Sequence, residues 1–187
     1  PQVIAGPIVR KVTSTECHIW VVTSNADSPT LNLSANEVVV SGNCQRETIR
    51  VGKYAFIHLL SFTSSEPFED TARIGYSLSF SDDAQQASWE NEQRGLLYDG
   101  QSSLCFHYTE TPETILHGSC RKPHFHSDDA LAQVDVLHKN AFKKQNDFPD
   151  LLLMTGDQIY ADDVAGPMLK AIHSVIDRLG LYHEALE

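Results

Sequence analysis

The spacing of apolar residues changes near Pro112, and this change limits the folds that the chain can adopt. Before Pro112, apolar residues recur at every second position in short runs, as in residues 73–80. A period of two is typical of a strand with one buried face and one face in water. After Pro112, short apolar runs alternate with segments of helical spacing, which indicates an α/β arrangement. The chain is therefore expected to contain two regions of different fold class.

The first region is expected to be a β-sandwich. About seven short strands separated by turn residues are expected here, at the spacing of immunoglobulin and fibronectin III domains. Residues 54–62 form the longest apolar run and suit a central strand. We predict that this immunoglobulin/fibronectin III-like sandwich covers residues 1–85 and that the polar residues 86–112 form a connector. Trp89 and the pair Leu96-Leu97 are expected to pin the connector to the face of a domain.

Residues 113–187 are expected to begin an α/β domain with the order β-α-β-α. Two short strands are predicted at 114–117 and 150–154. One helix is predicted at 128–146, and a second has Pro167 near its first turn. Since a strand, a helix and a second strand follow one another, the strands should be parallel and the crossover right-handed. The second strand is almost wholly apolar, which is typical of a strand that is buried on both faces.

The ends of the helices and of the chain carry further signals. Ser127 can cap the first helix, and Gly180 is expected to end the second. The chain begins at Pro1 without a methionine and ends at Leu186-Glu187 directly after a helical pattern. We therefore expect a piece of a longer protein, with the α/β domain cut off after its second helix.

Composition narrows the possible functions. Of the 187 residues, 14 are basic and 25 acidic, and the formal net charge of −11 argues against a nucleic-acid or anionic-membrane partner. No apolar run is long enough to span a bilayer. Four cysteines do not make a disulfide scaffold in a chain of this length. They favour the cytoplasm over the periplasm or export, while the compartment and the oligomeric state stay open.

Two segments that follow the expected strands contain the candidate catalytic and metal-binding residues. In an open parallel sheet, ligands bind beyond the carboxyl ends of the strands. The segments Gly118–Arg121 and Gly156–Tyr160 lie at such ends, so Cys120 and Asp157 should emerge at the same rim. Tyr160 follows Asp157 by about one helical turn and can point to the same place. Thiolate, carboxylate and phenolate together suit a highly charged iron, and the thiolate could also bind zinc.

Simpler interpretations of these residues stay open. Asp157 can be a helix cap or a turn residue. Cys120 can be an inert thiol, as free cysteines usually are. Arg121 can hold a substrate phosphate, or it can balance nearby carboxylates.

A different metal site also matches the spacing of ligands in this region. Cys120, His124 and His126 resemble the ligands of a small zinc site, but a second ligand cluster is missing from the sequence. Asp162 and Asp163 are either further metal ligands or a solvated acidic turn. The sequence does not decide between these roles.

In this order and spacing, the segments resemble the PhoD-like alkaline phosphatase/phosphodiesterase family, which belongs to the calcineurin-like metallophosphoesterase superfamily. The specific part of the resemblance is Gly-Ser-Cys, then a hydrophobic strand, then Gly-Asp-x-x-Tyr. The start of the chain is similar to the small β-sandwich that precedes the catalytic domain in PhoD-like proteins, so the resemblance covers nearly the whole chain. The matching segments are Ala5–Arg10, Ile19–Val21, Gly118–His124, Asp128–Leu131 and Leu151–Asp163.

The resemblance implies a multinuclear metal site that hydrolyses phosphate esters. In the superfamily, the aspartate that matches Asp157 bridges two metals. The tyrosine that matches Tyr160 binds ferric iron in purple acid phosphatases, and a cysteine in the place of Cys120 is an iron ligand in PhoD-like enzymes. We therefore expect Asp157 to be catalytic, all three residues to be metal ligands, and Arg121 to contact the substrate phosphate. The implied cofactors are ferric iron and a divalent metal such as calcium, manganese or zinc, and a metal-bound hydroxide would attack a phosphate mono- or diester.

The chain departs from the superfamily after these segments. The Gly-Asn-His-Asp/Glu and Gly-His-x-His motifs of the superfamily do not occur before Glu187. We therefore expect an incomplete metal centre and an inactive isolated chain, although the parent protein would be a phosphoesterase. The alternative is a non-catalytic β-sandwich that binds a partner through its surface and carries a structural α/β appendage.

Overall fold

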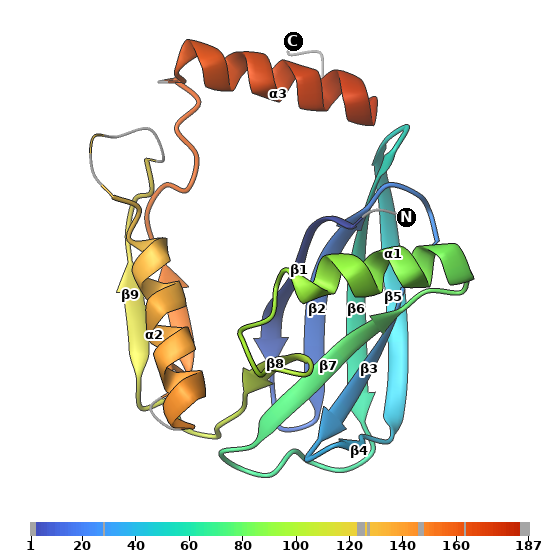
Figure 1. Cartoon of the computed structure of the whole chain (residues 1–187), viewed down its shortest axis with the longest axis vertical. Coiled ribbons are helices and arrows are strands. Elements are labelled where there is room, and N and C mark those ends of the chain that lie inside the picture. Colours follow the sequence, from blue (N-terminus) through green and yellow to red (C-terminus); the bar gives the residue numbers. More distant parts are fainter. Residues whose placement is uncertain are drawn as a thin grey trace. The chain divides into compact units, whose positions relative to one another are not determined.

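The computed structural model divides the chain into two compact units (Figure 1). The β unit comprises residues 1–108 and 174–187, and the α/β unit comprises residues 109–173. The structure describes residues 3–27, 29–122, 126, 128–145, 148–162 and 164–183.

The β unit contains two four-stranded sheets whose strands all pair in the antiparallel sense, which is compatible with a β-sandwich. The strand order is β1-β2-β6-β5 in one sheet and β4-β3-β7-β8 in the other. The apolar run that was expected to form a central strand is β6, and it does lie between two other strands. The bounds are β1 Val3–Val12, β2 Glu16–Thr23, β3 Thr30–Ala35, β4 Val38–Val39, β5 Gly42–Gly52, β6 Ala55–Ser64, β7 Arg73–Ser79 and β8 Leu104–His107.

Side chains along the strands of the β unit alternate between the core and the surface. In β7, Ile74, Tyr76 and Leu78 are buried, and the residues between them are more exposed, so the predicted half-buried strand is confirmed. In β2, Cys17 and Ile19 are fully buried. Burial raises the pKa of the Cys17 thiol to about 12, which keeps this cysteine neutral within the core. Removal of such apolar groups from water is the main source of stability in this unit.

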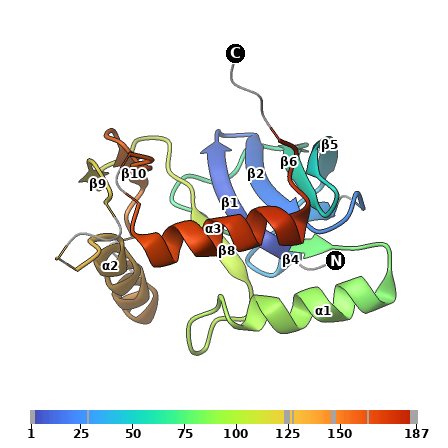
Figure 2. The same cartoon turned by 90° about the horizontal axis from the view of Figure 1, so that it is seen from above.

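A helix that the sequence did not predict lies at the start of the expected connector. It is α1 (Asp83–Arg94), and Asp82 caps it by accepting a hydrogen bond from a backbone N–H of the first turn at 2.9 Å. Trp89 is buried and meets the ring of Phe80 edge-on, with 6.5 Å between the ring centroids, so it pins this segment as expected. Leu96 is exposed, which corrects its predicted role in the same contact. Figure 2 shows α1 in green along one side of the strands.

The α/β unit contains two parallel strands and a helix between them in sequence. The strands are β9 (Ile115–Gly118) and β10 (Leu151–Met154), and their parallel pairing confirms the prediction. The helix between them is α2 (Leu131–Lys144). A second helix, α3 (Gly166–Leu179), begins in this unit, and its last residues belong to the β unit.

The helix ends agree in part with the sequence signals. α2 begins at Leu131, and its first backbone N–H donates to Oδ1 of Asp129 at 3.0 Å. The expected cap, Ser127, lies outside the described residues. Gly180 ends α3 in the left-handed region, with φ of +55°, as predicted. Among the described residues, no helix combines the length and the apolar character that are needed to cross a membrane.

The apolar strand β10 is exposed, which corrects the prediction that both of its faces are buried. Leu151, Leu152 and Leu153 expose between 38% and 42% of their surface. In the described part of the α/β unit, Ala141 is the one buried hydrophobic residue. An apolar pattern shows which surfaces a complete domain must cover, and two strands with their helices are too few to cover both faces.

One histidine is fully buried in the β unit within a hydrogen-bonded network. The two ring nitrogens of His58 lie 2.7 Å from Thr23 Oγ1 and 2.9 Å from Thr48 Oγ1. The Thr23 hydroxyl donates to the carbonyl of Asn25 at 2.7 Å, so the Nε2–H of His58 must donate to Thr23. Nδ1 then accepts from Thr48, and the ring is neutral. Burial lowers the pKa of His58, although the charge of Asp27 and a backbone hydrogen bond oppose this shift.

Protonation of His58 should destabilise the β unit. Because the pKa of His58 is lower in the folded chain than in the unfolded chain, the free energy of unfolding should fall as the pH drops below 6.5. Urea unfolding at a series of pH values, followed by the fluorescence of the two tryptophans, measures this dependence. His58→Gln removes the titrating group and should flatten the pH dependence. The same slope in the variant and in the unmodified chain would contradict the prediction.

Candidate metal site

Two segments leave the ends of β9 and β10 side by side. Just beyond the ladder, the N–H of Thr155 donates to the carbonyl of Gly118 at 3.2 Å. Further on, the N–H of Arg121 donates to the carbonyl of Asp157 at 2.8 Å. The backbone therefore brings Cys120 and Asp157 to the same rim of the sheet.

Gly156 permits the close approach of these two segments. A Cβ atom at this position would lie 2.5 Å from the backbone nitrogen of Cys120 and 2.6 Å from its Sγ. It would also lie 2.7 Å from Oγ of Ser119. Carbon atoms do not approach other heavy atoms this closely, so any other residue would push the segments apart.

Cys120 is exposed, and three neighbouring donors favour its thiolate form. The hydroxyl of Tyr160, the hydroxyl of Ser119 and the backbone N–H of Asp157 donate hydrogen bonds to the sulfur and lower the pKa of Cys120. Ser119 Oγ lies 3.7 Å from the sulfur. Slight desolvation and the negative charge of Asp157 oppose the shift. The thiolate is the form of cysteine that binds metals.

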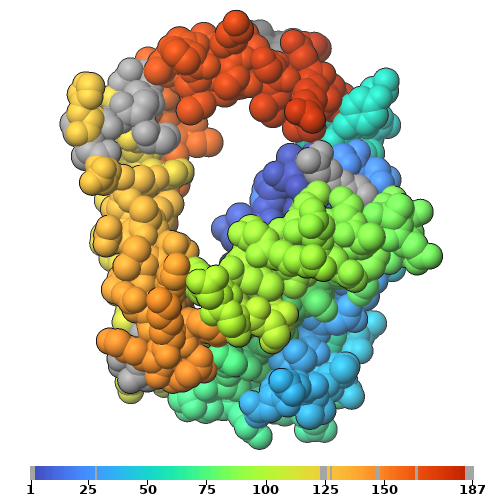
Figure 3. All heavy atoms as spheres, viewed as in Figure 1, coloured from blue at the N-terminus to red at the C-terminus, as the bar shows by residue number. Residues whose placement is uncertain are grey.

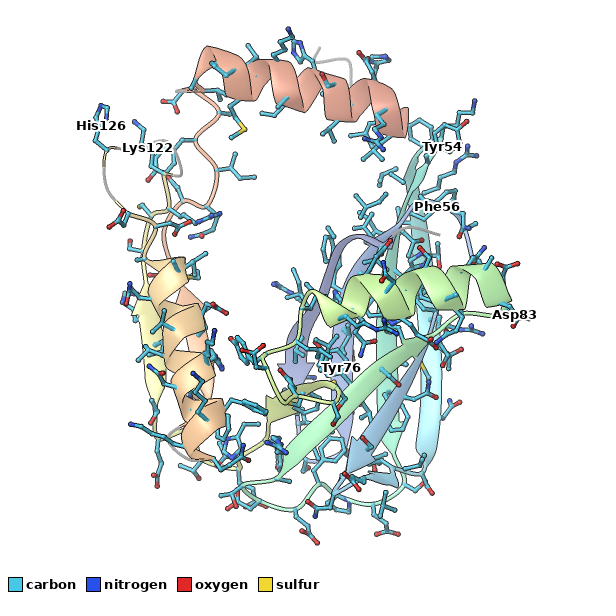
Figure 4. The ribbon with its side chains drawn as sticks, in the orientation of Figure 1. Tyr54, Phe56, Tyr76, Asp83, Lys122 and His126 are labelled. Carbon is cyan, nitrogen blue, oxygen red and sulfur yellow. The ribbon has the colours of Figure 1, made fainter. Side chains whose placement is uncertain are left out.

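Tyr160 is coupled to the same sulfur. Its hydrogen bond to Cys120, partial desolvation and the nearby negative groups raise the pKa of Tyr160 to about 12, so without a metal the phenol stays protonated at neutral pH. The negative groups include Asp157 and Asp162. Lys122 Nζ lies 6.0 Å from the centroid of the Tyr160 ring, a contact that the sequence did not predict. Figure 4 shows Lys122 on the segment that follows β9.

Asp157 is exposed, like most of the strand that precedes it, and Arg121 is paired with a carboxylate. Arg121 forms an ion pair with Asp129, in which Nε and Nη2 lie 2.9 and 2.6 Å from Oδ2. The pair raises the pKa of Arg121 and lowers the pKa of Asp129. Of the two roles considered for Arg121, the structure shows the balancing of a carboxylate.

The remaining candidate ligands are only partly described. Asp162 and His126 are exposed, and the charge of Asp162 acts on the phenol of the site. Figure 4 labels His126 on the segment that follows β9. His124 and Asp163 lie outside the described residues. The zinc site built on Cys120, His124 and His126 therefore stays a prediction.

Two further side chains hold the segments of the site together, and the sequence reasoning missed both. Gln158 donates from Nε2 to the carbonyls of Ser119 and Gly156, at 3.2 and 2.9 Å. Asp150 accepts hydrogen bonds from two backbone N–H groups just before β9, each at 2.9 Å. The available signal was position, because Gln158 lies within the segment Gly156–Tyr160 and Asp150 begins the expected strand 150–154.

The donors that meet at this rim fit part of a metal site. Within the described ranges, no group of three or more His, Cys, Asp or Glu side chains is placed to hold a metal ion. The rim offers one thiol, one carboxylate and one phenol, from Cys120, Asp157 and Tyr160. A favoured thiolate beside two further oxygen donors suits iron, but a stable centre would need additional ligands.

Comparison of the chain with models of protein families, with curated proteins and with solved structures finds no match. The PhoD-like resemblance therefore stays a prediction, and any proposed function rests on the geometry of the site.

Replacement of Gly156 by alanine should separate the two segments of the site. The new Cβ would meet the backbone nitrogen and the sulfur of Cys120, and overpacking of this kind costs about 1–3 kcal/mol. Amides of β9 and β10 should therefore exchange their hydrogens faster in Gly156→Ala than in the unmodified chain. Gly166→Ala is the matched control, because nothing lies within 4 Å of a Cβ there. Equal exchange in Gly156→Ala and the unmodified chain would rule out the close approach.

The thiol of Cys120 should be alkylated at lower pH than an ordinary thiol. Tyr160→Phe removes the largest cause of the shift, so it should move the pH profile of alkylation upward, toward the ordinary pKa of 9.0. Mass spectrometry of the Cys120 peptide separates this reaction from that of the buried Cys17. Tyr54→Phe, in the β unit, serves as the control. An identical profile for Tyr160→Phe and the unmodified chain would show that the phenol does not act on the sulfur.

Proposed function

We propose that this chain is the N-terminal part of a metal-dependent phosphoesterase similar to the PhoD-like family. The observation that carries the proposal is the meeting of Cys120, Asp157 and Tyr160 beyond the carboxyl ends of two parallel strands. Ligand sites of open parallel sheets lie at such ends. The β unit supports the proposal, because its two antiparallel sheets are compatible with the sandwich that the resemblance implies.

Cys120, Asp157 and Tyr160 are the residues that would hold metal. Their ionised forms are all negative and suit ferric iron, with a divalent ion such as calcium, manganese or zinc beside it. When bound, the two metals would activate water and neutralise charge during hydrolysis of a phosphate mono- or diester. The lowered pKa of Cys120 supports this assignment, since ligation requires the thiolate.

The other residues of the rim have distinct proposed roles. Asp157 is the proposed catalytic residue, and its backbone N–H also orients the sulfur of Cys120. Arg121 would reach a substrate phosphate by exchanging its partner Asp129 for that phosphate. Lys122 brings a second cation to the neighbourhood of the phenol.

We also propose that the α/β unit is the start of a larger α/β domain, so the isolated chain is inactive. Three protein donors are fewer than a pair of metal ions needs. The apolar residues of β10 are exposed, as are Met168, Leu169 and Ile172 of α3. Parallel sheets normally have both faces covered, so additional strands and helices would bury this surface.

A non-catalytic binding module is the second candidate function. The ion pair between Arg121 and Asp129 favours it, because the arginine already has a carboxylate partner. In this case the β unit, which has its own hydrophobic core, would bind a partner, and the α/β unit would be structural.

Titration with ferric iron tests the proposed ligands. A phenolate that binds ferric iron absorbs visible light, so the titrated chain should become coloured. The phenolate band should disappear in Tyr160→Phe, and the colour should weaken in Cys120→Ala and in Asp157→Asn. Tyr54→Phe should keep it, because Tyr54 lies outside the proposed ligand set. A titration that stays colourless in the unmodified chain would show that Cys120, Asp157 and Tyr160 do not bind ferric iron on their own.

Hydrolysis of an aryl phosphate monoester and diester, with added iron, manganese or calcium, tests whether the site is complete. We expect no turnover by residues 1–187. Robust turnover that a chelator removes would show that the ligands of this chain suffice. About one zinc per chain, lost in Cys120→Ala, would instead support the small zinc site with His124 and His126.

A further inference from the structure

The turn that joins β5 and β6 holds the C-terminal end of α3. The turn residues Lys53 and Tyr54, the adjacent Gly52 at the end of β5 and the residues that follow α3 all belong to the β unit. In the space-filling view, atoms of the turn (teal) lie against the end of α3 (red) (Figure 3). The two segments form an isolated antiparallel bridge between Gly52 and Leu181.

The end of α3 is closed by a left-handed glycine. The N–H of Gly180 donates to the carbonyl of Asp177 at 3.2 Å, and the N–H of Leu181 donates to that of Ile176 at 3.1 Å. This pair of hydrogen bonds is the Schellman motif. It leaves the last carbonyls of the helix and of its cap, those of Leu179 and Gly180, in need of donors.

The turn supplies those donors from its backbone. The N–H of Tyr54 donates to the carbonyl of Leu179 at 2.9 Å, and the N–H of Lys53 donates to that of Gly180 at 2.8 Å. In return, the N–H of Tyr182 donates to the carbonyl of Val51 at 3.1 Å. The turn therefore acts as a cap for a helix that lies far from it in sequence.

Two glycines allow the backbones to approach this closely. A Cβ atom on Gly52 would lie 2.9 Å from the carbonyl oxygens of both Gly180 and Leu179. A Cβ atom on Gly180 would lie 2.9 Å from the Cβ of Lys53. The fit thus depends on the absence of a side chain on each of the two segments.

A charged side chain and two aromatic rings add to the contact between the turn and the end of α3. The guanidinium of Arg50 lies 6.0 Å from the ring centroid of Tyr182 and 5.6 Å from that of Phe56. Figure 4 shows Phe56 and Tyr54 at this end of the hairpin. Positive charge near the C-terminal end of a helix is favourable because it meets the negative end of the helix dipole. Cation–π contacts with the exposed Tyr182 add to this effect.

No described residue of α3 is buried, so packing contributes little to the stability of this helix. An isolated helix of 14 residues is marginal in water. We propose that the β5–β6 turn is the anchoring site of α3, a surface whose partner is a helix C-terminus closed by glycine. The turn keeps α3 folded by capping it. This role is independent of the proposed phosphoesterase activity.

Hydrogen exchange of the full chain tests the proposal with Gly52→Ala. The φ of Gly52 lies outside the left-handed region, so alanine strains the contact with α3 and not the turn itself. Amides of α3 should exchange about tenfold faster or more in this variant, while those of β2 and β6 stay protected. Gly166→Ala, at the other end of the same helix, is the control: it meets no atom within 4 Å and removes a poor helix former, so it should not speed the exchange of α3.

Tyr182→Ala provides a second variant that leaves the turn sequence intact. It removes the ring that Arg50 contacts and should also speed exchange in α3, by a smaller factor. If Gly52→Ala unfolds the β unit, the exchange of α3 in Tyr182→Ala tests the proposal instead. Unchanged exchange of α3 in the folded variants would overturn the proposal. The proposal would also be overturned if the α3 amides of the unmodified chain exchange as fast as those of an unfolded peptide.

Discussion

The contact of Gly156 with the backbone of Cys120 is the constraint on which the candidate site depends. Parallel pairing of β9 and β10 brings two strand ends to one rim, but pairing alone does not bring their side chains into contact. Because position 156 lacks a Cβ, the second segment can pass directly against the first. The N–H of Asp157 and the hydroxyl of Tyr160 then reach the same sulfur. The close backbone approach thus places the donors that favour the thiolate of Cys120.

The two units are stabilised in different ways. The β unit has a hydrophobic core in which Ile19, Leu60 and Trp89 are almost completely buried. The described part of the α/β unit is held by a short ladder, hydrogen bonds at strand ends and the exposed ion pair of Arg121 with Asp129. Each such interaction contributes little in water. This difference supports the proposal that the α/β unit belongs to a larger domain whose other elements would cover its apolar faces.

Local pattern predicted several strands and the rim that Cys120 and Asp157 share, but not β8, which lies in the expected connector and pairs with β7. Alternation predicted the half-buried β7, and the rule for parallel strand ends predicted that Cys120 and Asp157 share a rim. The helix α1 was missed because Trp89 is its one buried residue, so it has no apolar stripe. A cap and one large aromatic contact hold it instead.

The features that were not predicted from the sequence depend on tertiary contacts. The ion pair of Arg121 with Asp129 depends on the path of the intervening loop, which residue spacing does not determine. The exposure of β10 was not predictable either. An apolar sequence indicates that a strand is stable when it is covered, but it does not show which elements cover it. The Gly156 approach and the hydrogen bond of Gln158 to Ser119 likewise arise between segments far apart in the chain.

Leu181 and Tyr182, beside β5, also cover part of the edge of a sheet. β5 is the last strand of its sheet, and such an edge can template pairing with another chain. Near the turn, that edge is already occupied by the bridge between Gly52 and Leu181. Along the rest of the strand, the charged side chains of Arg46 and Glu47 oppose contact with a second edge. The segment that follows α3 thus covers the edge of β5 at its turn end.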